Sequence, residues 1–507
     1  MKKHRHSLIA WLALVSATAC GNKSFNDYAN VTGGAGGQPP SGTGGASGTV
    51  GGGGGETPDA DSQDAVVDVG SDAAPFAFTC NDADLGAEPT IADPCATLTA
   101  THTVTAGKPT DETTVDTKTI QDAIGACPAG QSVKLVADGD NVAFLSAPLF
   151  MKSGVTLWID AGVTLFATRN PRDFDAAPGS PLCGKDASNS SCNGLINVQG
   201  GANISLVGQG TIDGRGGEPV IDADGGTSTW WQIENALDGN MAGPRIVQVS
   251  NSPNFTLYQL TLQNSPKFHI VIDRTNGFKV WGITVNTSPS SPNTDALDPS
   301  SSTNGIIAYN KLSTGDDNIA IKGGNGPVDG IIIAHNHFGR GHGMSIGSET
   351  NSGVRNITVC DLSLDGAQNG LRIKSDVSRG GIVERIGYSD VCMRGVRNPL
   401  VFDPFYTAGA TGTLIPFYRD IIVRNTHVLG GGALKMNGHD ATHVLTLTLD
   451  NVVFDSAPSF SSSFANLRYG PGPVSIPVPD AGTAVTTQID PVPADPKDCT
   501  NAFVSTD

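Results

Sequence analysis

Two short stretches of this 507-residue sequence bring acidic residues close together between apolar runs. Asp295 lies in "SPNTDALDP", and Asp316 and Asp317 lie in "GDDNIAIKG". Carboxylates at close quarters repel one another, so one of them is expected to keep its proton toward neutral pH. A group of carboxyls that shares a proton can supply both a general acid and a general base. That is the chemistry needed to hydrolyse a glycosidic bond.

Basic residues follow these acids at regular intervals. His342 lies in "GRGHGMSIGS", and Arg372 and Lys374 lie in "NGLRIKS", where they share one face of an extended strand. Each motif alone is typical of a solvated turn or strand edge, but the ordered series favours a single polar site. Asp-rich loops can also bind calcium; however, "NTDALD" lacks the ligand spacing of an EF-hand loop. We therefore expect no metal and no cofactor.

The segments that must position these residues are short β-branched runs separated by turn residues, such as "NFTLYQLTLQN", "GFKVWGITVN" and "GIIIAHNHF". Four runs close on an asparagine, at intervals of 22, 24 and 26 residues: Asn264, Asn286, Asn310 and Asn336. A period in the low twenties, with about three strands per unit, predicts an all-β fold, a right-handed single-stranded parallel β-helix. The four asparagines would form a hydrogen-bonded ladder. A β-sandwich, the rival fold, would instead show hairpin turns between alternating strands.

In a β-helix, residues at the same phase of consecutive coils lie about 4.8 Å apart. Five of the candidate catalytic and binding residues fall just before or within the strand that follows a turn. We therefore expect them in a column on one outer face: Asp295, Asp316, Asp317, His342 and Arg372. Neighbouring residues of a straight strand point to opposite faces. Asp316 and Asp317 can both serve the site only if the backbone bends, and Gly315 permits a bend.

The first twenty residues have a basic start, an apolar run and small residues before Cys20. They predict a lipoprotein-type signal peptide in which Cys20 carries the lipid, with ordinary secretion as the alternative. The chain is thus expected to be exported, either to a bacterial outer membrane or cell surface or into the medium. The net charge of −18 argues against nucleic acid as a partner, and a monomer is expected.

The rest of the chain divides by composition. We expect a disordered Gly/Ser-rich and acidic tether at 21–75, an N-terminal extension at 76–116, a parallel β-helix catalytic domain at 117–470 and an irregular C-terminal extension at 471–507. At the start of the catalytic domain, "TKTIQDAIGAC" has apolar residues at helical spacing. It predicts one short amphipathic helix that caps the open end of the stack.

Eight cysteines follow Cys20, at spacings that do not resemble a zinc site. An even number in an exported chain predicts disulfides. Cys183 and Cys192, within one short loop, are the single pairing that the sequence suggests; the other connectivities stay open.

The motifs "SPNTDALDP", "GDDNIAIK", "GHGMSIGS" and "RIK" resemble the four motifs of glycoside hydrolase family 28, the polygalacturonases and their relatives. The resemblance covers roughly 110–460 and includes "TKTIQDAI" and "GQGTIDGRGG". Ala296 departs from the family pattern, which usually has Gly there. The resemblance implies hydrolysis of the α-1,4-galacturonosyl linkages of pectin, an acidic plant polysaccharide, with inversion of configuration.

The resemblance also implies a role for each site residue. The roles are Asp316 as the general acid, Asp295 and Asp317 as the groups that activate water, His342 as the residue that tunes the acids, Arg372 and Lys374 as ligands of the substrate carboxylate, and Tyr406, in "FDPFYT", as a sugar contact. A related rhamnogalacturonan or xylogalacturonan hydrolase is the alternative within this family. Pectate lyases share the β-helix but need calcium and an arginine base. A non-catalytic surface β-helix that binds polysaccharide would tolerate loss of the acids and the histidine.

Overall fold

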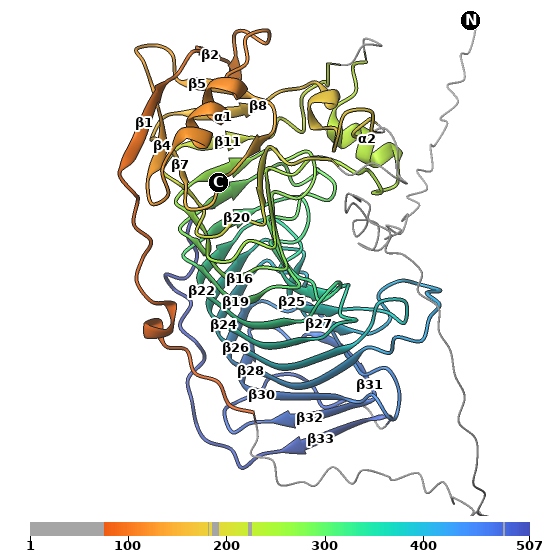
Figure 1. Cartoon of the computed structure of the whole chain (residues 1–507). Helices are drawn as coiled ribbons and strands as arrows, with labels where there is room; N and C mark the ends of the chain where they lie inside the picture. Colours follow the sequence, from red (N-terminus) through yellow and green to blue (C-terminus); the bar gives the residue numbers. More distant parts are fainter. Residues whose placement is uncertain (1–75, 181, 185–191, 222–225, 480–481, 507) are drawn as a thin grey trace, which may run out of the picture.

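The computed structural model describes residues 76–180, 182–184, 192–221, 226–479 and 482–506. Most of them lie in parallel strands wound into a right-handed β-helix, which confirms the expected fold (Figure 1). The expected signal peptide, the tether and Cys20 lie outside the described residues. Within the described ranges, no helix is long and apolar enough to cross a membrane.

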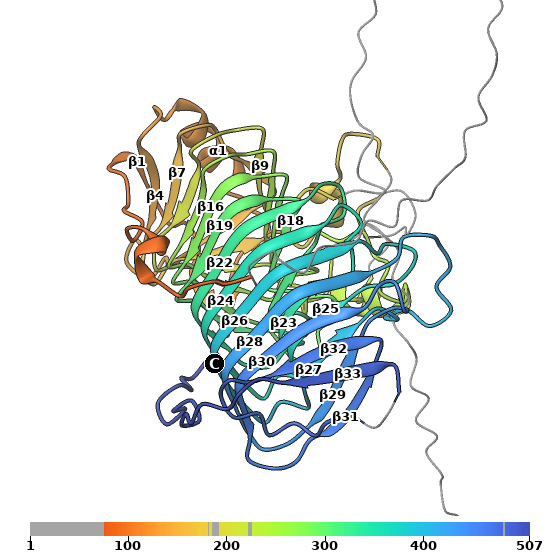
Figure 2. The same ribbon diagram turned by 90° about the horizontal axis from the view of Figure 1, so that it is seen from below.

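Each coil adds one strand to an 11-stranded sheet and one or two strand segments to a 20-stranded sheet, as far as the described residues go. The two sheets form separate faces of the solenoid (Figure 2). In the early coils, each coil contributes two short strands to the 20-stranded sheet. From β22 (Val328–Phe338) onward these merge, because β22 pairs with both β19 (Thr303–Ala308) and β20 (Lys311–Ser313) of the preceding coil.

The 11-stranded sheet consists of β6 (Leu149–Phe150), β9 (Ile196–Gln199), β12 (Val247–Ser250), β15 (Ile270–Asp273), β18 (Leu297–Ser300), β21 (Ile319–Ile321), β23 (Met344–Gly347), β25 (Asn369–Lys374), β27 (Asn398–Asp403), β29 (Ala433–Asn437) and β31 (Ser459–Ser463). The remaining strands of the 20-stranded sheet are β1 (Pro94–Thr99), β4 (Ser132–Val136), β5 (Ala143–Ser146), β7 (Thr156–Ile159), β8 (Thr164–Ala167), β10 (Ser205–Val207), β11 (Thr211–Asp213), β13 (Phe255–Tyr258), β14 (Thr261–Gln263), β16 (Asn276–Trp281), β17 (Thr284–Asn286), β24 (Val354–Asp365), β26 (Ile382–Arg394), β28 (Phe417–Leu429), β30 (Leu445–Phe454), β32 (Ala465–Tyr469) and β33 (Ala484–Gln488). A separate antiparallel pair joins β2 (Val104–Thr105) and β3 (Lys108–Pro109).

The interior of the solenoid is a continuous file of aliphatic side chains. In the 11-stranded sheet, one residue per coil pairs in register with the next, and every one of these side chains is fully buried: Leu297, Ile319, Met344, Leu371 and Leu400. A single coil cannot bury its own apolar face, so stacking is what creates this core.

The expected asparagine ladder forms only in part. Asn310 Nδ2 donates a hydrogen bond of 2.9 Å to Asn336 Oδ1, and both side chains are buried. Asn264 instead adopts a left-handed backbone conformation with φ 52°. Asn286 aligns with Ser313 rather than with Asn310. The prediction is wrong for these two because turn lengths vary, so an asparagine at a similar sequence interval falls at a different phase of the coil.

A helix caps the first strand of the 11-stranded sheet, as the sequence predicts. In α1 (Thr117–Ala126), Ile120 and Ile124 face the core, and α1 lies at the β1 end of the stack (Figure 1). Gln121 Nε2 donates to the Phe150 carbonyl at 2.9 Å, and the Phe150 N–H donates to Gln121 Oε1 at 2.8 Å. The helix thereby satisfies backbone groups on the open edge of β6.

A second helix and the ends of the stack differ from expectation. The sequence analysis missed α2 (Trp230–Ala236), which begins with a capping box between Thr229 and Gln232. Short 3₁₀ helices lie at Asp82–Leu85 and Pro171–Phe174. Parallel pairing also extends beyond 117–470, because β1 pairs with β4 and β33 pairs with β32.

Four disulfides link the described residues. Cys183 and Cys192 are bonded, which confirms the pairing that the sequence suggests. The other three pairs are Cys80–Cys360, Cys95–Cys127 and Cys392–Cys499.

Residues 76–93 form a strap across the outside of the coils. As the strap runs forward in sequence, the residues that it contacts run backward. The Phe78 ring centroid lies 4.2 Å from the Arg424 guanidinium carbon, and Cys80 is bonded to Cys360. Further along the strap, Asp82 Oδ1 lies 2.8 Å from His335 Nε2, and Glu88 accepts a 2.7 Å hydrogen bond from the Tyr258 hydroxyl. The strap therefore crosses successive coils and ties them together (Figure 1).

Candidate active site

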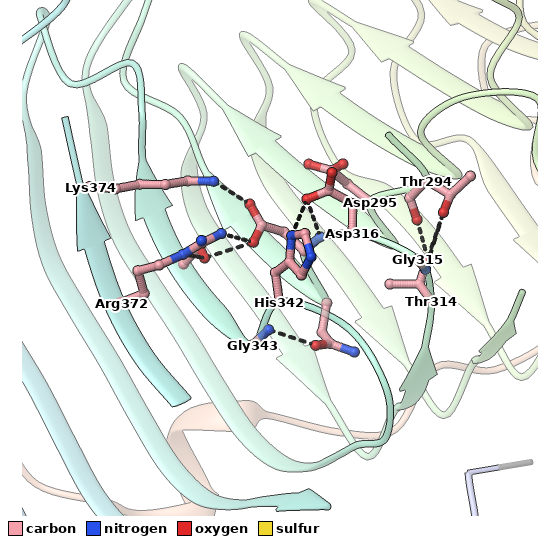
Figure 3. A network of polar contacts seen from close by, with 12 residues as sticks. Thr294, Asp295, Thr314, Gly315, Asp316, His342, Gly343, Arg372 and Lys374 are labelled. Carbon is pink, nitrogen blue, oxygen red and sulfur yellow. Dashed lines mark hydrogen bonds and ion pairs between the residues drawn. The ribbon is translucent and has the colours of Figure 1, made fainter. Parts of the chain in front are cut away.

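The acids and the histidine align across three neighbouring coils. Asp295, Asp317 and His342 each lie two residues before β18, β21 and β23, respectively, and these strands pair in register. Arg372 and Lys374 lie within β25, which pairs with β23. The structure thus brings the predicted residues together on one face (Figure 3).

The backbone bends at Gly315 and Asp316, as both acids require. A Cβ added at Gly315 would lie 2.0 Å from the Ser291 carbonyl oxygen, so close packing, rather than an unusual φ, demands glycine here. The Asp317 N–H donates to Asp316 Oδ1 at 2.8 Å, which stabilises the bend.

Asp316 pairs with His342. Asp316 Oδ1 accepts a hydrogen bond from His342 Nδ1 at 2.9 Å, and the His342 backbone N–H donates to the Asp316 carbonyl at 2.8 Å. Burial raises the pKa of Asp316, but the hydrogen bond and charge of His342 outweigh it and hold that pKa below its usual value. Burial lowers the pKa of His342, yet the bond to Asp316 and the Asp316 charge raise it overall. The pair therefore holds one proton firmly.

Asp317 is buried among cations. Lys374 Nζ lies 2.8 Å from Asp317 Oδ2, Ser345 Oγ donates to Oδ1 at 2.9 Å, and Arg372 Nη2 also contacts Oδ1. Arg372 Nε donates to Ser345 Oγ at 2.9 Å, which fixes the guanidinium. Burial raises the pKa of Asp317, but the charges of Arg372 and Lys374 outweigh it and hold the pKa far below its usual value. Asp317 is thus ionised.

Asp295 shares its surroundings with two residues that the sequence analysis missed. Lys322 Nζ lies 3.5 Å from a carboxylate oxygen of Asp295 and 3.5 Å from one of Asp298. Burial and then the charge of Asp298 raise the pKa of Asp295 well above its usual value. Burial raises the pKa of Asp298 to about 6. Burial lowers the pKa of Lys322, but Asp298 and Asp295 outweigh it and raise it overall.

The charges nearly balance. Four carboxylates share the site with three basic side chains other than the histidine: Asp295, Asp298, Asp316 and Asp317 with Lys322, Arg372 and Lys374. One additional proton neutralises the set, as the clustered acids predict. The raised pKa values of Asp295 and His342 indicate that this proton resides on Asp295 or on the Asp316–His342 pair. Asp316 is nevertheless the carboxyl open to a ligand: its side chain is 23% exposed, against 4% for Asp295 and 1% for Asp317.

The alignment of successive strands in the repeat could have identified Lys322 as a site residue. Lys322 follows the first residue of β21 by three positions, as Lys374 follows Leu371 in β25, and both cations face the acids. His269 was also missed. Its backbone N–H donates to the Asp295 carbonyl at 2.8 Å, and its ring Nδ1 lies 3.2 Å from the same oxygen. Burial lowers the pKa of His269 to about 4, so the His269 ring is neutral while it positions Asp295.

Two further residues named from the sequence have clear positions. Tyr406 is half-buried, with its ring centroid 5.0 Å from Lys374 Nζ, and its N–H donates to the Ser375 carbonyl at 2.9 Å. Ala296, which replaces the family glycine, is fully buried within the apolar core, so its methyl group has a place there.

Ligand atoms of Asp316, Asp317 and His342 lie within 4.8 Å of one another, close enough together to surround a metal ion. Arg372 and Lys374 already neutralise Asp317, however, and their positive charges oppose a divalent cation. The chemistry of this donor set is that of acid–base catalysis rather than of metal binding.

The similarity of this chain to known sequences and structures agrees with a site for glycoside hydrolysis. The model of the glycosyl hydrolases family 28 matches residues 142–467, and the chain belongs to this family of glycoside hydrolases. A polygalacturonase of Ralstonia solanacearum is 44% identical over 448 residues, covering 77% of this chain and 84% of the relative. An endo-polygalacturonase of Pectobacterium parmentieri is 40% identical over 389 residues, covering 75% and 92%. The solved polygalacturonase of Erwinia carotovora ssp. carotovora superposes with a TM-score of 0.68 at 39% identity, covering 75% of this chain and 98% of that one.

Proposed function

We propose that this chain is a polygalacturonase, which hydrolyses the α-1,4-galacturonosyl linkages of pectin with inversion of configuration. The single observation that carries the proposal is the juxtaposition of Arg372 and Lys374 with Asp317, beside the exposed Asp316–His342 pair. This arrangement combines acid–base groups with cations suited to a uronate, and polygalacturonases are among the relatives named above.

Asp316 is the general acid in this proposal. Its carboxyl is the most exposed of the three, so it can reach the glycosidic oxygen, and the proton it delivers is the one it shares with His342. As the bond between the anomeric carbon and that oxygen breaks, the oxygen takes this proton and leaves as a hydroxyl group. His342 then sets how readily the pair gives up its proton.

Asp317 and Asp295 activate the water. Asp317 is ionised at neutral pH because Arg372 and Lys374 stabilise its charge, so it can accept a proton from water. The water oxygen attacks the anomeric carbon from the face opposite the leaving group, which inverts its configuration in a single displacement. Burial raises the pKa of Asp295, so Asp295 orients the water by hydrogen bonding while Asp317 takes the water proton.

Arg372 and Lys374 recognise the sugar carboxylate. A guanidinium carries five N–H donors and an ammonium three, so each has more donors than Asp317 and Ser345 use. Guanidinium and carboxylate match in geometry, whereas the ammonium acts as a point charge. Tyr406, packed near Lys374, is placed to contact the sugar ring.

The decisive experiment combines product analysis with an inactive variant. The wild type should release reducing ends from polygalacturonate without unsaturated products, and the initial product should carry the inverted anomer by NMR. Asp316→Asn should lose about 10³-fold in kcat while keeping its fold by circular dichroism. Full activity of Asp316→Asn, or unsaturated ends from the wild type, would remove the assignment.

A matched control is available on the other side of the solenoid. Asp361 Oδ2 lies 2.7 Å from His335 Nδ1, so it forms an aspartate–histidine pair similar to that of Asp316 and His342. Asp361→Asn should leave kcat unchanged. A comparable loss in both variants would mean that the effect comes from stability rather than from chemistry.

We also propose that the chain is exported, with Cys20 as its lipid-bearing residue, and acts as a monomer. The four disulfides support an oxidising compartment. Mass spectrometry of the mature N-terminus tests the lipid: a Cys20→Ser variant that stays membrane-bound would contradict it.

A further inference from the structure

A second cluster of metal-ligating side chains lies outside the catalytic groups, in the loop "GHDATH" between β29 and β30. Ligand atoms of His439, Asp440 and His443 lie within 4.8 Å of one another. His439 Nδ1 lies 2.9 Å from Asp440 Oδ2, and His443 Nδ1 lies 3.2 Å from the same oxygen. Two imidazoles and one carboxylate therefore converge, and the mechanism proposed above uses none of them.

Backbone hydrogen bonds hold this loop in shape. The His439 N–H donates to the His443 carbonyl at 3.0 Å, which closes the loop on itself. The Gly438 N–H donates to the Ser463 carbonyl of the next coil at 2.9 Å. Both histidines are thus held at a fixed separation by the scaffold, as a preorganised site requires.

The carboxylate of Asp440 is oriented by three donors. Asp440 Oδ1 accepts hydrogen bonds from the Thr442 N–H at 2.8 Å, the Thr442 hydroxyl at 2.7 Å and the His443 N–H at 2.9 Å. These bonds fix Oδ1 and leave Oδ2 directed at both imidazoles. Carboxylates that bind metal ions are typically held by outer hydrogen bonds of this kind.

Aromatic rings from the preceding coil fix the two imidazoles. Phe405 stacks on His439, with ring centroids 5.1 Å apart, and Phe417 packs edge-on against His443 at 5.5 Å. The two imidazole rings are perpendicular to each other, at 89°. Both histidines remain partly exposed, so an ion can enter from solvent.

The charge around this loop differs from that of the catalytic site. Within the described residues, the ion pairs of Asp440 are with His439 and His443 alone. Asp317, by contrast, is neutralised by Arg372 and Lys374. A cation at the loop therefore meets a carboxylate whose charge no lysine or arginine offsets.

We infer that His439, Asp440 and His443 bind a divalent transition-metal ion of the Zn²⁺ type. Two imidazoles and a carboxylate suit such an ion better than calcium, which prefers oxygen ligands. Ligand atoms at about 2.0–2.1 Å from a tetrahedral Zn²⁺ lie about 3.3 Å apart. The separations of 2.9 and 3.2 Å therefore need only a small outward movement.

Binding moves one proton on each ring. Before an ion binds, each Nδ1 donates its proton to Asp440, because an ionised carboxylate only accepts. With the ion bound to Nδ1, each neutral imidazole carries its proton on Nε2, and water completes the coordination. The expectation of no metal was based on the Asp-rich loop around Asp295 and on the cysteine spacing, neither of which concerns this segment.

Direct titration of the untagged, disulfide-bonded protein with Zn²⁺ tests the site. Calorimetry should show one ion per chain for the wild type and loss of this binding step in His439→Gln and in His443→Gln, with the fold kept by circular dichroism. Thr442→Val, which removes one outer donor, should weaken binding about tenfold. A wild type that binds no Zn²⁺, or binding that survives in both histidine variants, would overturn the inference.

X-ray absorption at the zinc edge of the loaded wild type identifies the ligands without any substitution. The spectrum should show two imidazole nitrogens at about 2.0–2.1 Å. A spectrum without imidazole ligands would refute the site even if the histidine variants failed to fold.

Two control variants locate the ion. His335 Nδ1 faces Asp361 and His335 Nε2 faces Asp82, so these two carboxylates lie on opposite sides of the ring and do not share one ion. His335→Gln and His342→Gln should both keep one Zn²⁺ per chain. Loss of the ion in His342→Gln would place it in the catalytic site and overturn the inference. Binding is measured without substrate, so failure of the proposed function would leave this result unaffected.

Discussion

The Asp317 carboxylate lies 2.8 Å from the ammonium of Lys374, although the two residues belong to coils separated by a third. The coil between them contributes Ser345, whose hydroxyl donates to the same carboxylate at 2.9 Å. A single carboxylate therefore connects three coils. The cations that the proposed function assigns to substrate recognition also keep Asp317 ionised.

Lys374→Met should affect binding and chemistry together. We expect KM for polygalacturonate to rise about tenfold, because a buried cation opposite the sugar carboxylate is lost. The KM for methyl-esterified pectin should change much less, since the ester carries no charge. Steady-state kinetics on both polymers measures the difference. Equal increases would argue against carboxylate recognition by Lys374.

His342→Gln should shift the alkaline limb of the pH–rate profile. The pKa of His342 is raised above 6.5 by Asp316, so the wild-type pair keeps its proton to higher pH than an isolated histidine. Without His342, the single proton resides on Asp316 and is lost at lower pH. Profiles of kcat/KM against pH should show the limb displaced toward acid, with activity at pH 7 lowered by about tenfold or more. An unmoved limb would contradict the shared proton. His337→Gln, outside the site, provides the control.

Asp298→Asn should flatten the dependence of stability on pH. The pKa of Asp298 is raised by burial from 3.8 to about 6, so the folded chain binds more protons than the unfolded chain between these values. Wild-type stability should therefore fall as pH rises through this window, by about 3 kcal/mol from this group. Denaturant unfolding at pH 4 and pH 7 measures both proteins. Parallel profiles for the two would show that Asp298 does not titrate in this way.

Asn310→Ala should destabilise the solenoid more than Asn286→Ala. Asn310 Oδ1 accepts from the buried Ile283 N–H at 3.0 Å, and its amide donates to Asn336. Truncation leaves buried polar groups without partners, at a cost of about 1–3 kcal/mol in unfolding free energy. The half-buried Asn286 should cost no more than about 0.5 kcal/mol. Thermal unfolding of the two variants compares them directly, and equal losses would refute the partial ladder.

The sequence was informative wherever a residue precedes an apolar strand at a constant offset. Asp295, Asp317 and His342 each lie two positions before a strand, so the repeat alone predicts that they align. Asp298 lies inside the buried strand β18 and Lys322 directly follows the buried strand β21. Both were missed because charge is rare in such surroundings and the pattern suggests core. The asparagine ladder was overextended because sequence intervals do not measure turn length.

Contacts between the strap and the coils were beyond sequence reasoning for a different reason. Cys80 and Cys360 are separated by 280 residues, and the strap has no repeat of its own to set its register against the coils. By contrast, Cys183 and Cys192 are separated by nine residues, and proximity along the chain sufficed to pair them.

The position of Cys360 decides how the solenoid responds to mechanical tension. Cys360 lies in β24, which has β22 on one side and β26 on the other. The disulfide therefore links the strap covalently to an interior coil rather than to a terminal one. Force applied through the chain that precedes Phe76 is therefore delivered in the middle of the molecule. There it must shear long hydrogen-bonded strands at once, and the terminal coils cannot be peeled away one by one from that end of the polypeptide.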